Sequence, residues 1–456
     1  MHIAQVSLQF GATSTGGGGV HVEKITEYLR RRGHQVTVLS IHTDRTLTAA
    51  SELHPDGHWS QKTHDDLTVV RFLIEKGLES PYDGDKQTEL TRIHRFCQTV
   101  APWLQERAAT FDAVHLHGHH AVPGWLAWAL RACPEPRREQ DERRSRRDQP
   151  LRTVSTVHYL ESTNVSATQS GLMHYQISEA DLAQMIEWEA LARFADVPVI
   201  ISPGMAQYYL DLLADLDIDS AEVGPRLRLV SSGIDPESIR PRAEVEAKLA
   251  TVPDPVEVLT FARLDPVKGI EYAIRGAAQA AELTRRRFRL TVAGVPEEPI
   301  YIPVLEQEIE ATKRVLPVEF TIFDRIFTPA ERDRFLDRFH LYLFPTLREP
   351  FGLTVVEAGA RGLPVVTTDS PGPAYILGSS QSEEHAWGTV TDYGVLMQRS
   401  DDPEQNLAPN VAQALAWTLE NWKTAATQTL AFHRRVQERF TWPKVTEAYL
   451  ALYRGE

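Results

Sequence analysis

The stretch from Leu341 to Leu377 constrains the fold more than any other part of this 456-residue chain. It begins with an apolar run, Leu341–Phe344, and contains a second one, Leu363–Thr368, and both are predicted to be buried strands. The segment between them, Leu353–Arg361, is predicted to be a short helix. A strand, a helix and a second strand in this order form a unit of a parallel sheet. Such sheets bind ligands where strands end and helices begin, so the stretch predicts an α/β fold with a site in front of the helix.

Two glutamates of this stretch need attention. Glu357 lies in a helix that is otherwise apolar and small, where a carboxylate without hydrogen-bond donors is costly. A bound ligand or a buried arginine could supply those donors. Glu349 is held outside the first helical turn because Pro350 disfavours helical backbone at the residue before it. The backbone N–H groups of residues 351–353 lie at the positive end of the helix dipole and predict an anion site.

Length and composition place the chain among globular proteins of two or three domains, with 42% hydrophobic and 24% charged residues. Its net charge of −14 argues against a general binder of nucleic acid or anionic membranes. The N-terminus has the pattern of a first strand and not of a signal peptide, and we find no apolar run long enough for a transmembrane segment. Only Cys97 and Cys133 occur, too few for a disulfide framework, so we expect a cytoplasmic protein. The oligomeric state is not indicated.

The N-terminal residues predict a strand, a helix and a strand with a glycine-rich loop in front of the helix. The predicted elements are Ile3–Leu8, His21–Arg32 and Gln35–Ser40. Glycines at such a position let a phosphate approach the backbone, although a flexible turn is the simpler interpretation. The loop lacks strict G-x-G-x-x-G spacing and no acidic residue ends the second strand, so we do not predict a dinucleotide site.

Histidines mark the ends of two further predicted strands. Ala113–His117 places His115 and His117 on one face, but no nearby carboxylate or cysteine completes a ligand set, and we predict no metal site. Thr153–Val157 is followed by His158, at the end of a parallel strand where functional residues are often found. A single histidine of this kind is also commonly structural.

Two cations follow the first strand of the second half of the chain. Strand Val256–Ala262 leads into Arg263 and Lys268, and two such cations at a strand-to-helix junction can hold both phosphates of a diphosphate. The alternative is a pair of solvated surface cations. Before this strand, Glu237–Asp254 is charged and weakly periodic, and we expect a linker there. Pro134–Leu151 is crowded with charge and predicts a solvated surface loop, although its arginines could instead contact a partner.

Seven residues separate Glu349 from Glu357, and this spacing resembles the two-glutamate signature of the retaining, metal-independent glycosyltransferases of the GT-B fold. Within this family 4 type, EPFGLTVVEA with the later GLP and GP is most similar to sucrose synthases and sucrose-phosphate synthases. The resemblance implies two Rossmann-like doubly wound domains facing a central cleft. Residues 1–236 would bind the acceptor, residues 237–432 the donor, and residues 433–456 would form a helix that crosses back onto the first domain.

The resemblance also assigns roles to residues. Glu349 would contact the transferred sugar and Glu357 the ribose hydroxyls, while Arg263 and Lys268 match the R-L-x-x-x-K-G motif that holds the pyrophosphate, with Ala262 in place of the usual preceding glycine. His158 matches a T-x-H pattern whose histidine approaches the reacting sugar, so His158, Glu349, Arg263 and Lys268 form the implied catalytic set. Further donor-side residues are Gly18, Gly19, Arg325, Ile326, Phe351, Gly352 and Leu353, and acceptor-side residues are His117, His119, Glu161 and Asn164.

The activity implied is that of a retaining hexosyltransferase. It would move glucose or N-acetylglucosamine from a nucleotide-diphosphate sugar, expected to carry UDP, to a hydroxyl of a sugar, sugar phosphate or cyclitol. In this family a donor phosphate oxygen is described as taking the acceptor proton, so no enzyme nucleophile, cofactor or metal is expected. The partners would be the donor and a small acceptor, without nucleic acid. GDP and ADP stay open, and so does a nucleotide-sugar epimerase or hydrolase on the same scaffold.

Overall fold

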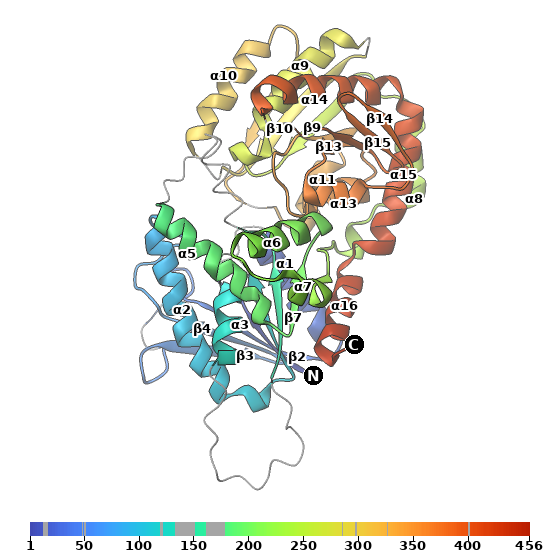
Figure 1. Ribbon diagram of the computed structural model, residues 1–456. Coiled ribbons are helices and arrows are strands. Elements are labelled where there is room, and N and C mark those ends of the chain that lie inside the picture. Colours follow the sequence, from blue (N-terminus) through green and yellow to red (C-terminus); the bar gives the residue numbers. More distant parts are fainter. Residues whose placement is uncertain are drawn as a thin grey trace. The chain divides into compact units, whose positions relative to one another are not determined.

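The computed structural model describes residues 1–11, 17–47, 49, 52–118, 122–132, 151–160, 178–284, 286–296, 299–325, 327–399 and 402–456. The chain forms two compact units (Figure 1). Unit 1 consists of Met1–Ile201, Met205–Ser231 and Trp442–Glu456, and unit 2 of Ser202–Gly204 and Ser232–Thr441. Each unit contains an eight-stranded, mainly parallel sheet with helices, which confirms the predicted α/β class with Rossmann-like domains.

The sheet of unit 1 has the strand order β3-β4-β2-β1-β5-β6-β7-β8, with β3 antiparallel to β4 and parallel pairing elsewhere. Its strands are β1 (His2–Val6), β2 (Gln35–Ile41), β3 (Trp59–His64), β4 (Leu67–Phe72), β5 (Ala113–Gly118), β6 (Arg152–Val157), β7 (Val197–Ile200) and β8 (Arg228–Leu229). Its helices are α1 (Gly17–Arg31), α2 (Lys86–Glu106), α3 (Val122–Ala132), α5 (Glu179–Ala190), α6 (Pro203–Asp215), α7 (Ser220–Val223) and α16 (Trp442–Arg454). The strand order reverses between β1 and β5, which defines a switch point.

The sheet of unit 2 has the order β11-β10-β9-β12-β13-β16-β15-β14, and its switch point lies between β9 and β12. Its strands are β9 (Val256–Phe261), β10 (Phe288–Gly294), β11 (Val318–Ile322), β12 (Leu341–Phe344), β13 (Val365–Thr368), β14 (Ser382–His385), β15 (Gly388–Thr391) and β16 (Val395–Met397). Its helices are α8 (Arg242–Leu249), α9 (Ile270–Leu283), α10 (Ile302–Thr312), α11 (Pro329–Leu336), α12 (Leu353–Ala360), α13 (Pro371–Leu377), α14 (Pro403–Glu420) and α15 (Trp422–Arg439). The pairs β14–β15 and β15–β16 are antiparallel.

The central stretch folds as predicted, with β12, α12 and β13 in sequence. Helix α12 is apolar because it is packed on all but its first turn, and Val355 and Val356 are fully buried. It packs closely against α15 at Gly359, where an added Cβ would lie 2.2 Å from the ring of Phe432. Glycine costs helix stability, so its presence here reflects this close approach of two helices.

The segment 237–254 is not a linker. It contains α8, whose Val245 and Leu249 are buried in the core of unit 2. Helix α1 begins at Gly17, four residues earlier than predicted, because the first N–H groups of a helix need no intrahelical acceptor and a glycine-rich first turn is tolerated. The predicted charged loop at 134–151 lies outside the described residues except for Leu151.

Helix α16 belongs to unit 1 and is part of its core. Trp442, Tyr449 and Tyr453 are buried there against β-strand residues such as Ile3 and Val154.

Among the helices that the structure describes, none is both long enough and apolar enough to cross a bilayer.

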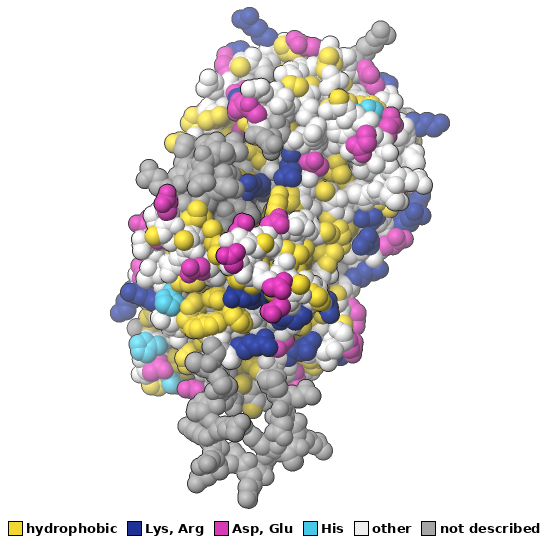
Figure 2. Space-filling model, viewed as in Figure 1, with side chains coloured by type: hydrophobic (Ala, Val, Ile, Leu, Met, Phe, Trp, Pro, Cys, Tyr) yellow, Lys and Arg dark blue, Asp and Glu magenta, His cyan; other side chains and the backbone are white. Residues whose placement is uncertain are grey.

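Charged side chains of both signs lie next to one another across the coloured part of the face shown in Figure 2. Mixed charge of this kind gives this face no extended field of one sign. That the chain binds no nucleic acid stays a prediction.

We predict that Gly359→Ala lowers the stability of unit 2 by about 1–3 kcal/mol, because the new methyl group overlaps the buried ring of Phe432. Differential scanning calorimetry measures the change. Gly224→Ala is the matched control, since an added Cβ there meets no atom within 4 Å. Equal unfolding temperatures for both variants would contradict the packing argument.

Candidate functional site

The switch point of unit 2 brings together two predicted residues that are far apart in the chain. β9 and β12 are parallel neighbours, and the loops after them carry Lys268 and Glu349. Lys268 Nζ donates a hydrogen bond of 2.9 Å to Glu349 Oε2. Both side chains are largely buried, with 10% and 16% of their surface exposed. The structure therefore excludes solvated surface positions for this lysine and glutamate.

The loop after β9 is fixed by short-range hydrogen bonds. Asp265 accepts a hydrogen bond of 2.9 Å from the Val267 N–H and caps a 3-10 turn at Pro266–Lys268. Gly269 has a φ of +62°, and an added Cβ would lie 2.3 Å from the Pro345 carbonyl oxygen, so this position requires glycine. These constraints set the direction of the lysine side chain.

The loop after β12 is tied to its neighbours. The carbonyl of Val267 accepts hydrogen bonds from the Leu347 N–H at 2.8 Å and from Thr346 Oγ1 at 3.2 Å. Glu349 N–H donates to Ser370 Oγ at 2.7 Å, and the Glu349 carbonyl accepts from Gly372 N–H at 2.8 Å. The backbone at Glu349 is thus held from both sides.

Arg263, the other cation of this loop, is more exposed than Lys268. Its side chain is 43% exposed, and its Nη2 lies 3.6 Å from Asp265 Oδ2. A guanidinium in this position can offer its planar fork to a phosphate group.

Helix α12 begins at Leu353 without a side-chain cap. Gly352 is its N-cap with a φ of +99°, and a Cβ at this position would approach the Glu349 Cγ to 3.3 Å. Phe351 is buried, with its ring 5.9 Å from that of Phe440. The Val355 and Val356 N–H groups donate to the Gly352 carbonyl, at 3.0 and 3.3 Å. The predicted anion position is therefore formed by the N–H groups that precede them, beside Glu349.

The buried carboxylate of Glu357 accepts a hydrogen bond from the side chain of Arg332. Arg332 Nη1 donates to Glu357 Oε1 at 2.7 Å, and Arg332 Nη2 lies 3.2 Å from Asp333 Oδ1. Burial raises the pKa of Glu357, and the positive charge of Arg332 opposes this rise. Pairing with an arginine, one of the two possibilities left open by the sequence, is therefore present, and that arginine is largely buried, with 17% of its side chain exposed.

The predicted base-binding loop is described only in part. The Arg325 side chain is 57% exposed and pairs with Glu331 in the first turn of α11. Ile326 lies outside the described residues.

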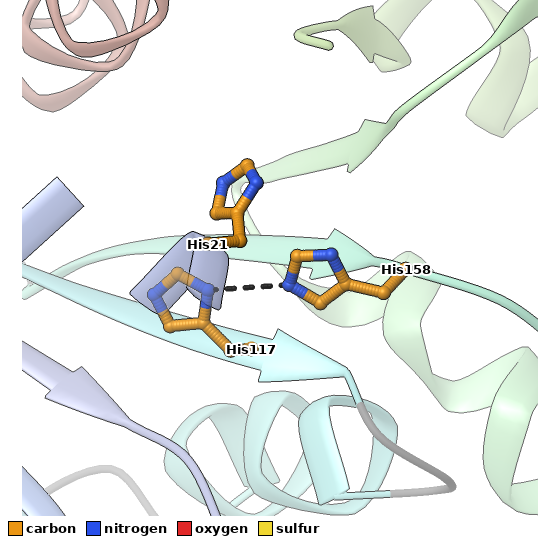
Figure 3. Close-up of side chains that lie close together, drawn as sticks. All are labelled: His21, His117 and His158. Atoms are coloured by element: carbon orange, nitrogen blue, oxygen red, sulfur yellow. Dashed lines mark hydrogen bonds between the residues drawn. The ribbon is translucent and has the colours of Figure 1, made fainter. Parts of the chain in front are cut away.

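In unit 1, His117 at the end of β5 and His158 after β6 lie side by side. His158 Nε2 is 3.5 Å from His117 Nδ1. His21 of α1 joins them, and one ring nitrogen of each histidine lies within 4.8 Å of the others (Figure 3). All three are buried, and burial lowers the pKa of His158 well below its usual value, with His21 adding to the effect.

Other polar groups surround these histidines. His115 contacts the Tyr453 hydroxyl and Thr156 Oγ1, each at 2.7 Å. Burial lowers the pKa of His115 as well, so it is neutral near pH 7. Gly18 and Gly19 lie in the first turn of α1. His119, Glu161 and Asn164 lie outside the described residues.

Sequence reasoning missed Arg332, Ser370 and His21. Nothing in the sequence distinguishes Arg332 from the exposed Arg334 of the same helix, because only the fold covers most of the Arg332 side chain and leaves it 17% exposed. The sequence does offer a signal for His21. This residue is in the helix that follows β1, and β1 is the neighbour of β5, which carries His117.

Comparisons with known proteins agree with this architecture. The family model described as "Family 4 Glycosyltransferase in conflict systems" matches residues 151–448, and the one described as "Glycosyl transferase 4-like domain" matches residues 16–218. A D-inositol 3-phosphate glycosyltransferase of Corynebacterium urealyticum is 23% identical, over 95% of this chain and 95% of the relative. Sucrose-phosphate synthase from Thermosynechococcus elongatus superimposes with a TM-score of 0.69 at 19% identity, over 100% of this chain and 98% of that one. Anabaena HepE, solved in complex with UDP-glucose, superimposes with a TM-score of 0.62 at 15% identity over the full length of both chains.

We predict that Arg332→Ala destabilises unit 2 by about 3 kcal/mol at pH 7.5, because the Glu357 carboxylate loses its buried partner. The folded-state pKa of Glu357 would then rise further, so the loss grows as pH increases above the unfolded value of about 4.3 and is small at pH 4.5. Calorimetric unfolding of the wild type and the variant at pH 7.5 and at pH 4.5 measures this loss of stability.

Arg334→Ala, on the same helix but exposed, is the matched control. Adding Glu357→Gln to Arg332→Ala should restore part of the stability at pH 7.5. A loss that does not depend on pH would contradict the assigned ion pair.

Proposed function

Because this chain belongs to the family 4 glycosyltransferases, we propose that it is a retaining enzyme that moves a hexose from a UDP-sugar to a hydroxyl of a small acceptor. That it is a hexosyltransferase of the GT-B type follows from the family. The donor nucleotide, the retention of configuration and the residue roles are the proposal.

The observation that carries the proposal is the Lys268–Glu349 ion pair at the switch point of unit 2. A diphosphate bound at the start of α12 would replace Glu349 as the partner of Lys268. Glu349 would then be available for hydroxyls of the transferred sugar. Arg263, beside the same loop, would hold the second phosphate through its planar fork.

Ribose recognition is assigned to Glu357. Arg332 donates to its Oε1, and we propose that its Oε2 accepts hydrogen bonds from the ribose hydroxyls. Burial raises the pKa of Glu357 and the positive charge of Arg332 opposes this rise, which favours the carboxylate form, and a charged acceptor makes stronger hydrogen bonds than a neutral one.

The proposed chemistry depends on stabilising the diphosphate as it leaves. Lys268, Arg263 and the N–H groups at the start of α12 would stabilise the negative charge that develops on the leaving diphosphate, because preorganised charges and dipoles need little reorganisation during the reaction. A donor phosphate oxygen would take the acceptor proton, and no side chain is assigned as nucleophile. The transfer is therefore proposed to need no metal.

The acceptor is proposed to contact unit 1 through His117 and His158. His158, neutral and buried at the end of β6, would donate or accept a hydrogen bond to align the reacting groups. The named relatives are an inositol-phosphate glycosyltransferase and a sucrose-phosphate synthase, so a phosphorylated sugar or cyclitol is the acceptor class that we favour. A cytoplasmic location stays a prediction.

Calorimetric titration of the protein with UDP, GDP and ADP, each with and without EDTA, tests the donor assignment. We expect UDP to bind most tightly and EDTA to leave its affinity unchanged, because the phosphate partners are side chains and backbone groups. Loss of UDP binding with EDTA would contradict the metal-free site. Consumption of UDP-sugar without any acceptor would favour the hydrolase or epimerase alternative.

We predict that Lys268→Ala reduces turnover of the donor by about 100-fold or more, in the range seen when one preorganised charge-stabilising group is removed. Thermal unfolding should confirm that the variant folds. Lys313→Ala is the matched control, because Lys313 is 57% exposed and, among the residues that the structure describes, forms an ion pair with Glu310 one helical turn away. Turnover unchanged by Lys268→Ala would contradict the pyrophosphate role.

A further inference from the structure

We propose that His21, His117 and His158 of unit 1 form a binding site for a divalent transition metal ion, with Zn²⁺ as the best fit. The three side chains come from α1, the end of β5 and the residue after β6, so the fold alone brings them together (Figure 3). The sequence alone predicts no metal site here, because it places His117 on one strand face with His115 and offers no carboxylate or cysteine nearby to complete a ligand set.

The distances suit a small ion. In a tetrahedral zinc site with Zn–N bonds of about 2.0–2.1 Å, two ligand nitrogens lie about 3.3 Å apart. His117 Nδ1 and His158 Nε2 are 3.5 Å apart, close to this value. The ligand atoms of all three histidines lie within 4.8 Å of one another. A modest rotation of the side chains about their χ angles would bring all three nitrogens to bonding distance of one ion.

The chemistry of the three groups favours a transition metal over Mg²⁺ or Ca²⁺. Imidazole nitrogen is a preferred ligand of zinc, copper and nickel, whereas the harder cations require oxygen ligands. Metal binding uses the neutral form of histidine, whose free ring nitrogen bonds the ion. Three protein ligands also leave a fourth position for water or a hydroxyl group.

Oxygen atoms hold two of the rings in place. His117 Nε2 lies 2.9 Å from Gln5 Oε1, and His21 Nε2 lies 3.1 Å from the Tyr449 hydroxyl. Such contacts behind ligand histidines fix ring orientation in metal sites. Gln5 lies on β1 and Tyr449 on α16, so the core of unit 1 supports the cluster.

A metal at this position would inhibit transfer. This step rests on the proposed function, in which His117 and His158 contact the acceptor or the sugar. An imidazole nitrogen bonded to zinc cannot at the same time hydrogen-bond a substrate. Metal binding itself does not depend on that proposal.

The test is a titration of EDTA-treated, dialysed protein with Co²⁺ and then Zn²⁺, without nucleotide. We expect one Co²⁺ per chain with the visible absorption of a four-coordinate site, and its displacement by Zn²⁺. His21→Gln should weaken binding by more than about tenfold, since even the loss of a supporting contact costs that much. His64→Gln removes an imidazole that is 87% exposed and should have no effect.

Equal Co²⁺ affinity in the wild type and in a folded His21→Gln variant would overturn the site, and so would absorption typical of six-coordinate cobalt. Should His21→Gln not fold, X-ray absorption at the zinc edge of the wild-type protein decides, because three imidazole ligands support the proposal and one or none refutes it. Zn²⁺ should also inhibit transfer in the wild type. If no transferase activity exists, the cobalt spectrum still tests the site.

Discussion

The pairing of β9 with β12 at the point where the strand order reverses is the constraint on which the candidate donor site depends. Parallel neighbours end at the same edge of a sheet, so the loops after them must meet. This is why Lys268 and Glu349 form a largely buried ion pair although 80 residues separate them. The loop after β12 donates hydrogen bonds to the Val267 carbonyl, and the glycine at position 269 lets the two loops approach closely.

Buried charges at the switch point of unit 2 pair with one another. Removing one member of a buried pair costs more than the pair contributes, so each charge needs a partner in every state of the protein. Lys268 pairs with Glu349, and Arg332 pairs with Glu357. In the proposed function a diphosphate would replace Glu349 as the partner of Lys268, and the ribose hydroxyls would bind Glu357 beside Arg332, so no buried charge would lose its partner.

Local sequence patterns predicted much of the fold, and contacts between distant residues account for what they missed. The strands β12 and β13 and the helix α12 follow from apolar runs with clear ends. Segment 237–254 was misjudged because α8 buries only Val245 and Leu249, too few apolar residues for a clear period. The position of Glu357 in an apolar helix predicted a hydrogen-bond donor for it but did not identify Arg332 as that donor. The histidine cluster could not be predicted because its residues come from three elements that only the fold brings together. The roles carried over from the family stay predictions.

The central claim is that the loops at the switch point of unit 2 bind the diphosphate of a nucleotide sugar. A crystal structure of the protein with UDP tests it most directly. We expect Lys268 Nζ and the Arg263 guanidinium within hydrogen-bond distance of phosphate oxygens, with Lys268 no longer bonded to Glu349. UDP bound elsewhere, with the Lys268–Glu349 pair intact, would contradict the claim.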